Sequence, residues 1–101
     1  MRLTPHQITI LKEVGLEVFG PQARLYLFGS RTDDTQRGGD IDLYVTGVHN
    51  TVAEMLAGKI RFLVRAKQRL GERRIDLVFA PAEGKTQEPI QRIARETGIA
   101  L

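Results

Sequence analysis

Three aspartates occupy positions from which two predicted strands would hold carboxylates on one surface. Asp40 and Asp42 open the segment DIDLYV, and Asp76 stands in RIDLVFA. Residues two apart on a strand point to the same face, about 6.6 to 6.8 Å apart along the chain, so Asp40 and Asp42 share the outer face. Ile41 and Leu43 then face the core. Carboxylates this close repel each other and raise each other's pKa unless a cation lies between them. Because hard oxygen ligands favour Mg²⁺ or Mn²⁺, the pattern predicts a divalent metal site suited to phosphoryl chemistry.

A Gly-Ser pair ends the apolar segment ARLYLF before these aspartates. A strand that runs through Gly29 and Ser30 into a helical turn would present backbone N–H groups and a hydroxyl at a helix N-terminus. Such a terminus binds phosphate well, because its donors are unpaired and the helix dipole favours anions. Glycine would also let a phosphate approach the backbone closely.

Each of these elements also has a simpler interpretation. A Gly-Ser pair after a strand is commonly an ordinary turn. Aspartates on strands commonly prevent edge pairing or form surface ion pairs, here with Arg73 or Arg74. The three elements favour a chemical role only because they occur together, in this order and at this spacing.

The rest of the chain predicts the elements that position these residues. Thr4, Pro5 and Gln7 form a capping-box pattern for a helix that ends near Phe19. We expect strands at 23–28, 40–45 and 74–80, a long helix from Asn50 or Thr51 through Leu70, and a last helix from about Pro89 to Gly98. This order predicts an α/β (α+β) domain with a small mixed sheet of three or slightly more strands, flanked by helices.

The long helix is expected to bury one apolar face. Its large apolar residues are assigned to that face on their helical spacing: Val52, Met55, Leu56, Ile60, Leu63 and Val64. The basic residues of the stretch 59–74 then form either a solvated helix surface or a docking surface for an acidic partner or nucleic acid. The apolar tail 99–101 is a second candidate docking surface.

Length and composition restrict the function classes. The 101 residues predict one domain, 1–101, with little room for a separate substrate domain. There are no cysteines and no apolar run long enough to cross a bilayer, so we expect a soluble, cytoplasmic protein without a membrane partner. The net charge of +3 is modest and the basic stretch lacks the interleaved exposed aromatics of a stacking platform, so direct nucleic-acid binding is not expected.

The composite motif resembles the nucleotidyltransferase superfamily that includes DNA polymerase beta. It consists of Gly29-Ser30, nine intervening residues, Asp40-Ile41-Asp42 and the later Asp76 in RIDLVF. More narrowly, the chain is similar to the minimal nucleotidyltransferases, which carry the catalytic core without an appended domain. The resemblance covers almost the whole chain and implies the polymerase beta-like nucleotidyltransferase fold.

The resemblance also implies a role for each motif residue. Gly29 and Ser30 would bind nucleotide phosphates, with Arg31 as a further phosphate contact. Asp40 and Asp42 would coordinate Mg²⁺ or Mn²⁺. Asp76 would be the third metal-binding carboxylate and would help to activate the acceptor hydroxyl. All three acidic positions are filled, which favours an active enzyme that uses ATP or another nucleoside triphosphate as donor.

Members of this subfamily are commonly paired with an all-helical subunit of the HEPN type. In several such pairs the small transferase is an antitoxin that moves AMP from ATP onto a tyrosine of its partner. The resemblance therefore implies protein adenylyl transfer in a toxin–antitoxin system. Transfer to a small molecule such as an aminoglycoside, or inhibition by binding alone, stay open as alternatives, as does homo-oligomer formation.

Overall fold

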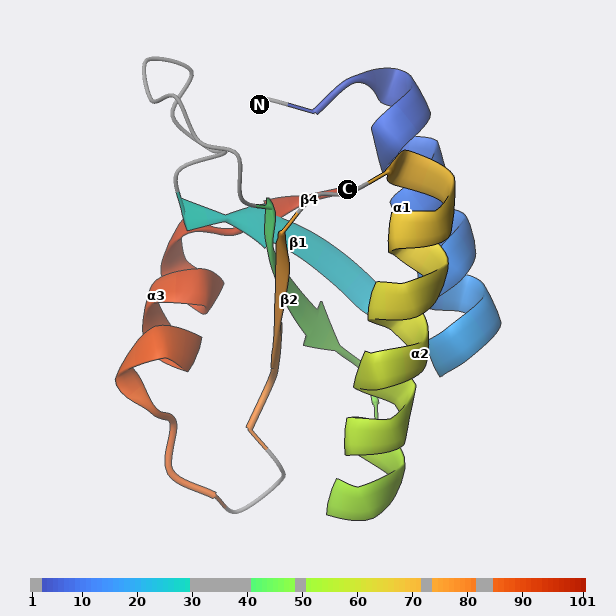
Figure 1. Cartoon of the computed structure of the whole chain (residues 1–101). Coiled ribbons are helices and arrows are strands. Elements are labelled where there is room, and N and C mark those ends of the chain that lie inside the picture. Colours follow the sequence, from blue (N-terminus) through green and yellow to red (C-terminus); the bar gives the residue numbers. More distant parts are fainter. Residues whose placement is uncertain (1–2, 30–40, 49–50, 72–73, 82–84) are drawn as a thin grey trace.

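The computed structural model describes residues 3–29, 41–48, 51–71, 74–81 and 85–101 (Figure 1). Within these residues, three helices and four strands follow one another. Their order is α1 (Pro5–Phe19), β1 (Arg24–Phe28), β2 (Ile41–Thr46), α2 (Val52–Leu70), β3 (Ile75–Phe79), α3 (Pro89–Thr97) and β4 (Ile99–Ala100). The helices and the first three strands agree with the sequence-based prediction to within a residue or two, and the predicted α/β class is confirmed.

The strands form one mixed sheet in the order β3-β2-β1-β4. β1 pairs antiparallel with both β2 and β4, and β2 pairs parallel with β3. The parallel pair requires a crossover, which α2 supplies. The segment 99–101, expected to be an apolar tail, instead extends the sheet: Ile99 and Ala100 form β4, and the Leu101 N–H donates to the Leu25 carbonyl at 3.1 Å.

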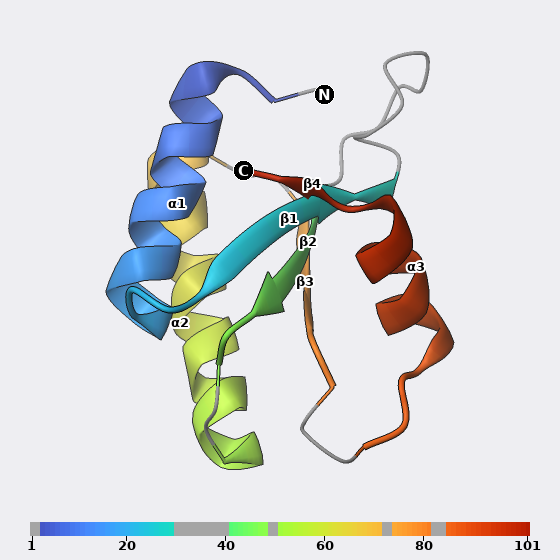
Figure 2. The same cartoon turned by 180° about the vertical axis from the view of Figure 1, so that it is seen from behind.

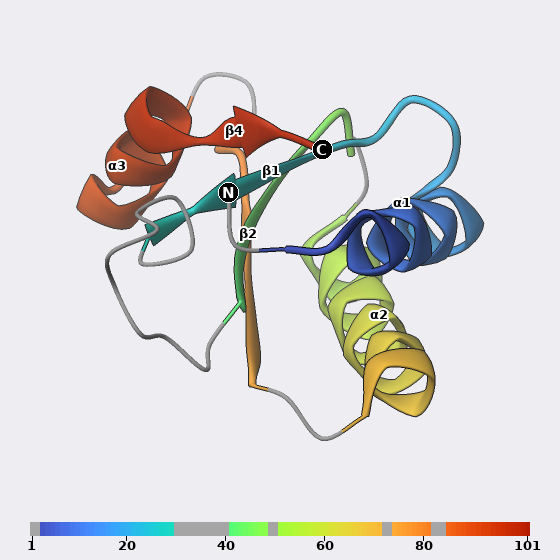
Figure 3. The same cartoon turned by 90° about the horizontal axis from the view of Figure 1, so that it is seen from above.

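The helices lie in two layers around the sheet. Figures 1 and 3 show α1 and α2 side by side on one face and α3 on the other, and Figure 2 shows the same arrangement from behind. The main core lies between the sheet and the α1–α2 pair, where alternate strand residues meet buried helix residues. A smaller cluster of Phe28, Tyr44 and Ala94 lies under α3.

The capping box predicted for α1 is present. The Thr4 hydroxyl accepts from the Gln7 N–H at 3.1 Å, and the Gln7 side chain accepts from the Thr4 N–H at 2.9 Å. Thr51 and Glu54 do the same for α2, which shows that the cap is Thr51 rather than Asn50. Each box satisfies donors that the first helical turn leaves open, so both helix starts are fixed by local sequence.

The predicted buried face of α2 is wrong for four of its six residues, while Leu63 is partly buried against the core. The buried positions are Gly58, Phe62 and Ala66, whereas four of the residues assigned to the core are exposed: Val52, Leu56, Ile60 and Val64. The reason is the close approach of α1, because a Cβ on Gly58 would lie 3.0 Å from the Phe19 ring. Phe62 stacks on the same ring, with a centroid distance of 5.6 Å. Small residues and one aromatic therefore form the contact that larger aliphatic residues were expected to form.

Among the described residues, no helix combines the length and the apolar character needed to span a membrane.

Candidate functional site

Two of the three predicted aspartates lie in register on adjacent strands. Asp42 is the second residue of β2 and Asp76 the second residue of β3, and the two are direct partners in the parallel pairing. Phe28, the last residue of β1, is the antiparallel partner of Asp42. The three side chains alternate with buried core residues, so they point to the face covered by α3. The sequence-based prediction that Asp42 and Asp76 face one shared site therefore agrees with the strand register.

Gly29 follows directly and lies against the Asp42 carboxylate. Its φ is +77°, a conformation that L side chains rarely adopt, and an added Cβ would lie 2.5 Å from Asp42 Oδ2. The backbone at the end of β1 thus lies very close to the Asp42 carboxylate. Any residue larger than glycine at position 29 would displace that carboxylate. Two of the motif elements, the glycine and the aspartate, meet in space.

A cavity of about 460 Å³ contains these groups. Its lining includes Gly29, Asp42 and Asp76, together with Lys59 from α2. On the other side it is bordered by two exposed isoleucines of α3, Ile90 and Ile93. Lys59 was not predicted as a site residue, since only the crossover of α2 over β2 and β3 places it beside the carboxylates.

Asp76 also takes part in a long ion pair. Arg74 Nε lies 3.9 Å from Asp76 Oδ2, and the Asp76 side chain is 50% exposed. The surface ion pair considered as the simpler interpretation therefore exists. At this distance and exposure such a pair contributes about 0 to 1 kcal/mol, so it leaves the carboxylate accessible for another role.

The remaining predicted site residues, Ser30, Arg31 and Asp40, lie outside the described residues. Among the residues that are described, no group of three or more His, Cys, Asp or Glu side chains comes together to hold a metal. The described part of the site consists of the carboxylate pair, the close-approaching glycine and the neighbouring lysine.

The comparison with protein families concerns the domain as a whole. The family described as nucleotidyltransferase domain matches residues 8–100. The chain belongs to this nucleotidyltransferase family. No curated protein matches it. The match includes every motif residue, so Gly29, Asp42 and Asp76 lie together within a nucleotidyltransferase domain.

The nucleotidyltransferase carboxylates suit a magnesium ion. Mg²⁺ is usually held by one or two carboxylates, while phosphate oxygens and water complete its shell. Asp42 and Asp76 supply such a pair from two neighbouring strands. The donor set therefore fits the metal that this chemistry uses.

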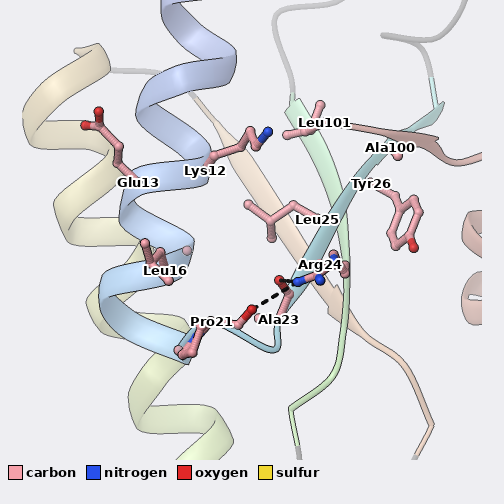
Figure 4. A pocket seen from close by; sticks show the side chains of 12 residues that line it. Lys12, Glu13, Leu16, Pro21, Ala23, Arg24, Leu25, Tyr26, Ala100 and Leu101 are labelled. Carbon is pink, nitrogen blue, oxygen red and sulfur yellow. Dashed lines mark hydrogen bonds between the residues drawn. The ribbon is translucent and has the colours of Figure 1, made fainter.

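A second cavity of similar volume has a different character. It lies between α1 and the β1–β4 side of the sheet, with Leu16, Leu25 and Leu101 in its lining (Figure 4). Arg24 at its border donates to the carbonyls of Pro21 and Ala23 at 3.0 and 3.1 Å. Of the predicted site residues that the structure describes, Gly29, Asp42 and Asp76, none lines this cavity, so its size alone does not connect it with nucleotidyl transfer.

Proposed function

We propose that this nucleotidyltransferase moves AMP from ATP to a hydroxyl group, with release of pyrophosphate, in a reaction that requires Mg²⁺ or Mn²⁺. The observation that carries the proposal is the in-register pair of Asp42 and Asp76 on β2 and β3, next to Gly29. Bound Mg²⁺ would neutralise phosphate charge and align the attacking and leaving oxygens.

The chain's own groups then divide the work. Asp42, with Asp40, would hold the metal, which would supply positive charge to the triphosphate. Gly29 and Ser30 offer backbone and hydroxyl donors to the phosphates, and Arg31 adds a cationic contact. Asp76 contributes as a third metal-binding carboxylate and accepts the proton of the acceptor hydroxyl, as a general base within hydrogen-bond reach would.

The acceptor we propose is a tyrosine of an all-helical HEPN-type subunit, within a cytoplasmic toxin–antitoxin pair. The support is the resemblance of almost the whole chain to minimal nucleotidyltransferases, with 1–101 taken as a single domain. A physical argument agrees with it, because phosphoryl transfer depends on holding the acceptor in line, and this positioning can supply about 7 to 11 kcal/mol of the barrier. A small domain gains that positioning from a partner.

Intact-mass spectrometry tests the proposal. The chain, a candidate helical partner and Mg-ATP are incubated together, and we expect the partner to gain the mass of AMP at a tyrosine. The chain alone should transfer little to free small hydroxyl compounds. A partner of unchanged mass, together with aminoglycosides modified by the chain alone, would replace this acceptor with a small molecule.

Two aspartate variants test the division of labour. Asp42→Asn should lose both Mg-ATP binding in a calorimetric titration and transfer. Asp76→Asn should keep most of the binding and lose transfer, because its proposed main role is towards the acceptor. Equal loss of Mg-ATP binding in the two variants would make Asp76 a metal ligand only.

A further inference from the structure

A row of exposed apolar side chains runs along α2. Val52, Leu56, Ile60 and Val64 are 83%, 58%, 56% and 51% exposed, and each follows the previous one by four residues. We call these four residues the α2 stripe. Of the eight large apolar side chains that the structure describes as exposed, four belong to this stripe and two to α3. The exposed apolar side chains are therefore concentrated on two helices rather than scattered over the surface. Such concentration is typical of protein interaction sites.

The stripe faces away from the rest of the domain. The α1-facing side of α2 carries Gly58, packed on Phe19, and the arginines Arg65 and Arg69. At 3.6 residues per turn, the mean direction of the stripe lies about 180° from the mean direction of those three residues. Neither α1 nor the core can therefore cover it.

The stripe is continuous with the carboxylate cavity. Lys59, which lines that cavity, precedes Ile60 and is one helical turn from Leu56. On the opposite side the cavity is bordered by Ile90 and Ile93 of α3, both exposed. The edge strand β3 lies between α2 and α3, as Figure 1 shows. One partner could thus contact the stripe and reach the entrance of the cavity.

The charges beside the stripe indicate the chemistry of its partner. On the α1 side, Arg65 and Arg69 are neutralised by Glu17 and Glu13, at 2.7 and 2.8 Å. On the stripe side the basic residues are Lys59 and Lys67, and neither forms an ion pair with the described part of the chain. Unneutralised cations next to an apolar row favour a surface with complementary carboxylates.

We propose that the α2 stripe is the docking surface for an amphipathic helix of a partner protein. The apolar face of that helix covers Val52, Leu56, Ile60 and Val64, and carboxylates beside this face approach Lys59 and Lys67. A second copy of this chain is the poorer occupant, since it would bring like charges together. That the docked helix also delivers the acceptor hydroxyl to Asp42 and Asp76 is an extension that rests on the proposed function.

Fluorescence anisotropy tests docking separately from catalysis. The probe is a labelled helical peptide of about 20 residues with leucines along one face and glutamates beside them; a second peptide carries lysines in place of the glutamates. Neither ATP nor metal is added. The glutamate peptide should bind at least about tenfold more tightly than the lysine peptide, as expected for several complementary charges.

Variants locate the binding surface. Ile60→Glu and Lys67→Glu should each weaken binding of the glutamate peptide several-fold. The matched control is Leu16→Glu, because Leu16 on α1 is also 56% exposed but lies outside the stripe; it should leave binding unchanged. Circular dichroism should give all three variants the unfolding midpoint of the parent chain to within a few degrees.

Three results would overturn the proposed docking surface: no binding of the glutamate peptide, equal binding of both peptides, or an equal loss of peptide binding in Leu16→Glu and Ile60→Glu. A dimer in sedimentation velocity that Ile60→Glu dissociates would assign the stripe to a second copy instead. Because the assay contains no nucleotide, a negative result would count against the docking surface and not against the proposed Mg-ATP binding and transfer. Peptide binding, together with a helical partner whose mass stays unchanged after incubation with the chain and Mg-ATP, would retain the docking surface and count against the acceptor proposal alone.

Discussion

The two faces of the sheet differ in the side chains that they cover. The face under α1 and α2 is closed by packed aliphatic and aromatic side chains from the helices and the strands. The opposite face is covered by α3, which has nine residues against fifteen and nineteen in α1 and α2, and it keeps Asp42 and Asp76 in contact with a cavity. Strand alternation produces this division, because the same strands direct apolar residues to one side and carboxylates to the other. On the proposed function, stability and chemistry belong to opposite faces, and substitutions should separate them.

The largest effect on stability is expected on the closed face, which is the face of the sheet under α1 and α2. Phe62 is fully buried and stacks on Phe19, so Phe62→Ala should lower the free energy of unfolding by about 3 to 5 kcal/mol. Urea denaturation followed by circular dichroism measures this. If Phe62→Ala does not fold, Phe62→Leu should fold and lose about 1.5 kcal/mol or less. A change below about 1 kcal/mol in the alanine variant would mean that this face is not the main core.

On the open face, which is the face of the sheet under α3, we expect a large loss of transfer rate and little change in stability. Asp42→Asn should reduce the transfer rate about 10² to 10³-fold, the usual result of removing one preorganised electrostatic group. The unfolding free energy should change by less than about 1 kcal/mol, because the side chain is outside the main core. A kinetic assay with labelled ATP and a competent acceptor, together with urea denaturation, gives both values. Full activity in this variant would disprove the assignment of the open face.

Gly29→Ala tests the close approach to Asp42. The left-handed backbone costs a non-glycine residue about 1 to 2 kcal/mol, and the new Cβ must displace the Asp42 carboxylate. Stability and transfer should therefore both fall. Gly20→Ala is the matched control, since Gly20 has a φ of +94° but nothing within 4 Å of an added Cβ. It should lose similar stability and keep its transfer rate; equal transfer rates in the two variants would show that the contact with Asp42 has no catalytic consequence.

The smallest effect is expected between α1 and α2. Glu17 pairs with Arg65 at 2.7 Å, but both side chains are about half exposed. Glu17→Gln should therefore lower the unfolding free energy by about 1 kcal/mol or less and leave transfer unchanged. Urea denaturation and the transfer assay measure these effects. A loss above about 2 kcal/mol would mean that this ion pair, rather than the aromatic contact, joins the two helices.

Local sequence predicted most of the elements, because their ends depend on short-range chemistry. Thr4 with Gln7 and Thr51 with Glu54 fix the starts of two helices within four residues of chain. The alternation around Asp42 likewise predicted which side of β2 would face the core. The β4 strand was missed, since its two residues become a strand only by pairing with the distant β1.

Tertiary packing limited the prediction of the site and of α2. Lys59 has no motif of its own and reaches the cavity only because α2 crosses over the sheet. The choice between two apolar sides of α2 depends on how closely α1 approaches at Gly58. Large apolar residues were expected inside, but the close helix contact selects small ones and leaves the stripe outside. The prediction for Ser30, Arg31 and Asp40 concerns positions outside the described residues and stays a prediction.

Paramagnetic NMR with Mn²⁺ and ATP tests the central claim, that the α3 face binds the metal–nucleotide complex. Substoichiometric Mn²⁺ should broaden the amide signals of Gly29, Asp42 and Asp76, and leave those of Leu11 and Val14 in the closed core much less affected. Asp42→Asn should largely abolish the broadening. Broadening centred instead on the acidic residues of α1, Glu13 and Glu17, or unchanged broadening at Asp76 in the Asp42→Asn protein, would contradict the account.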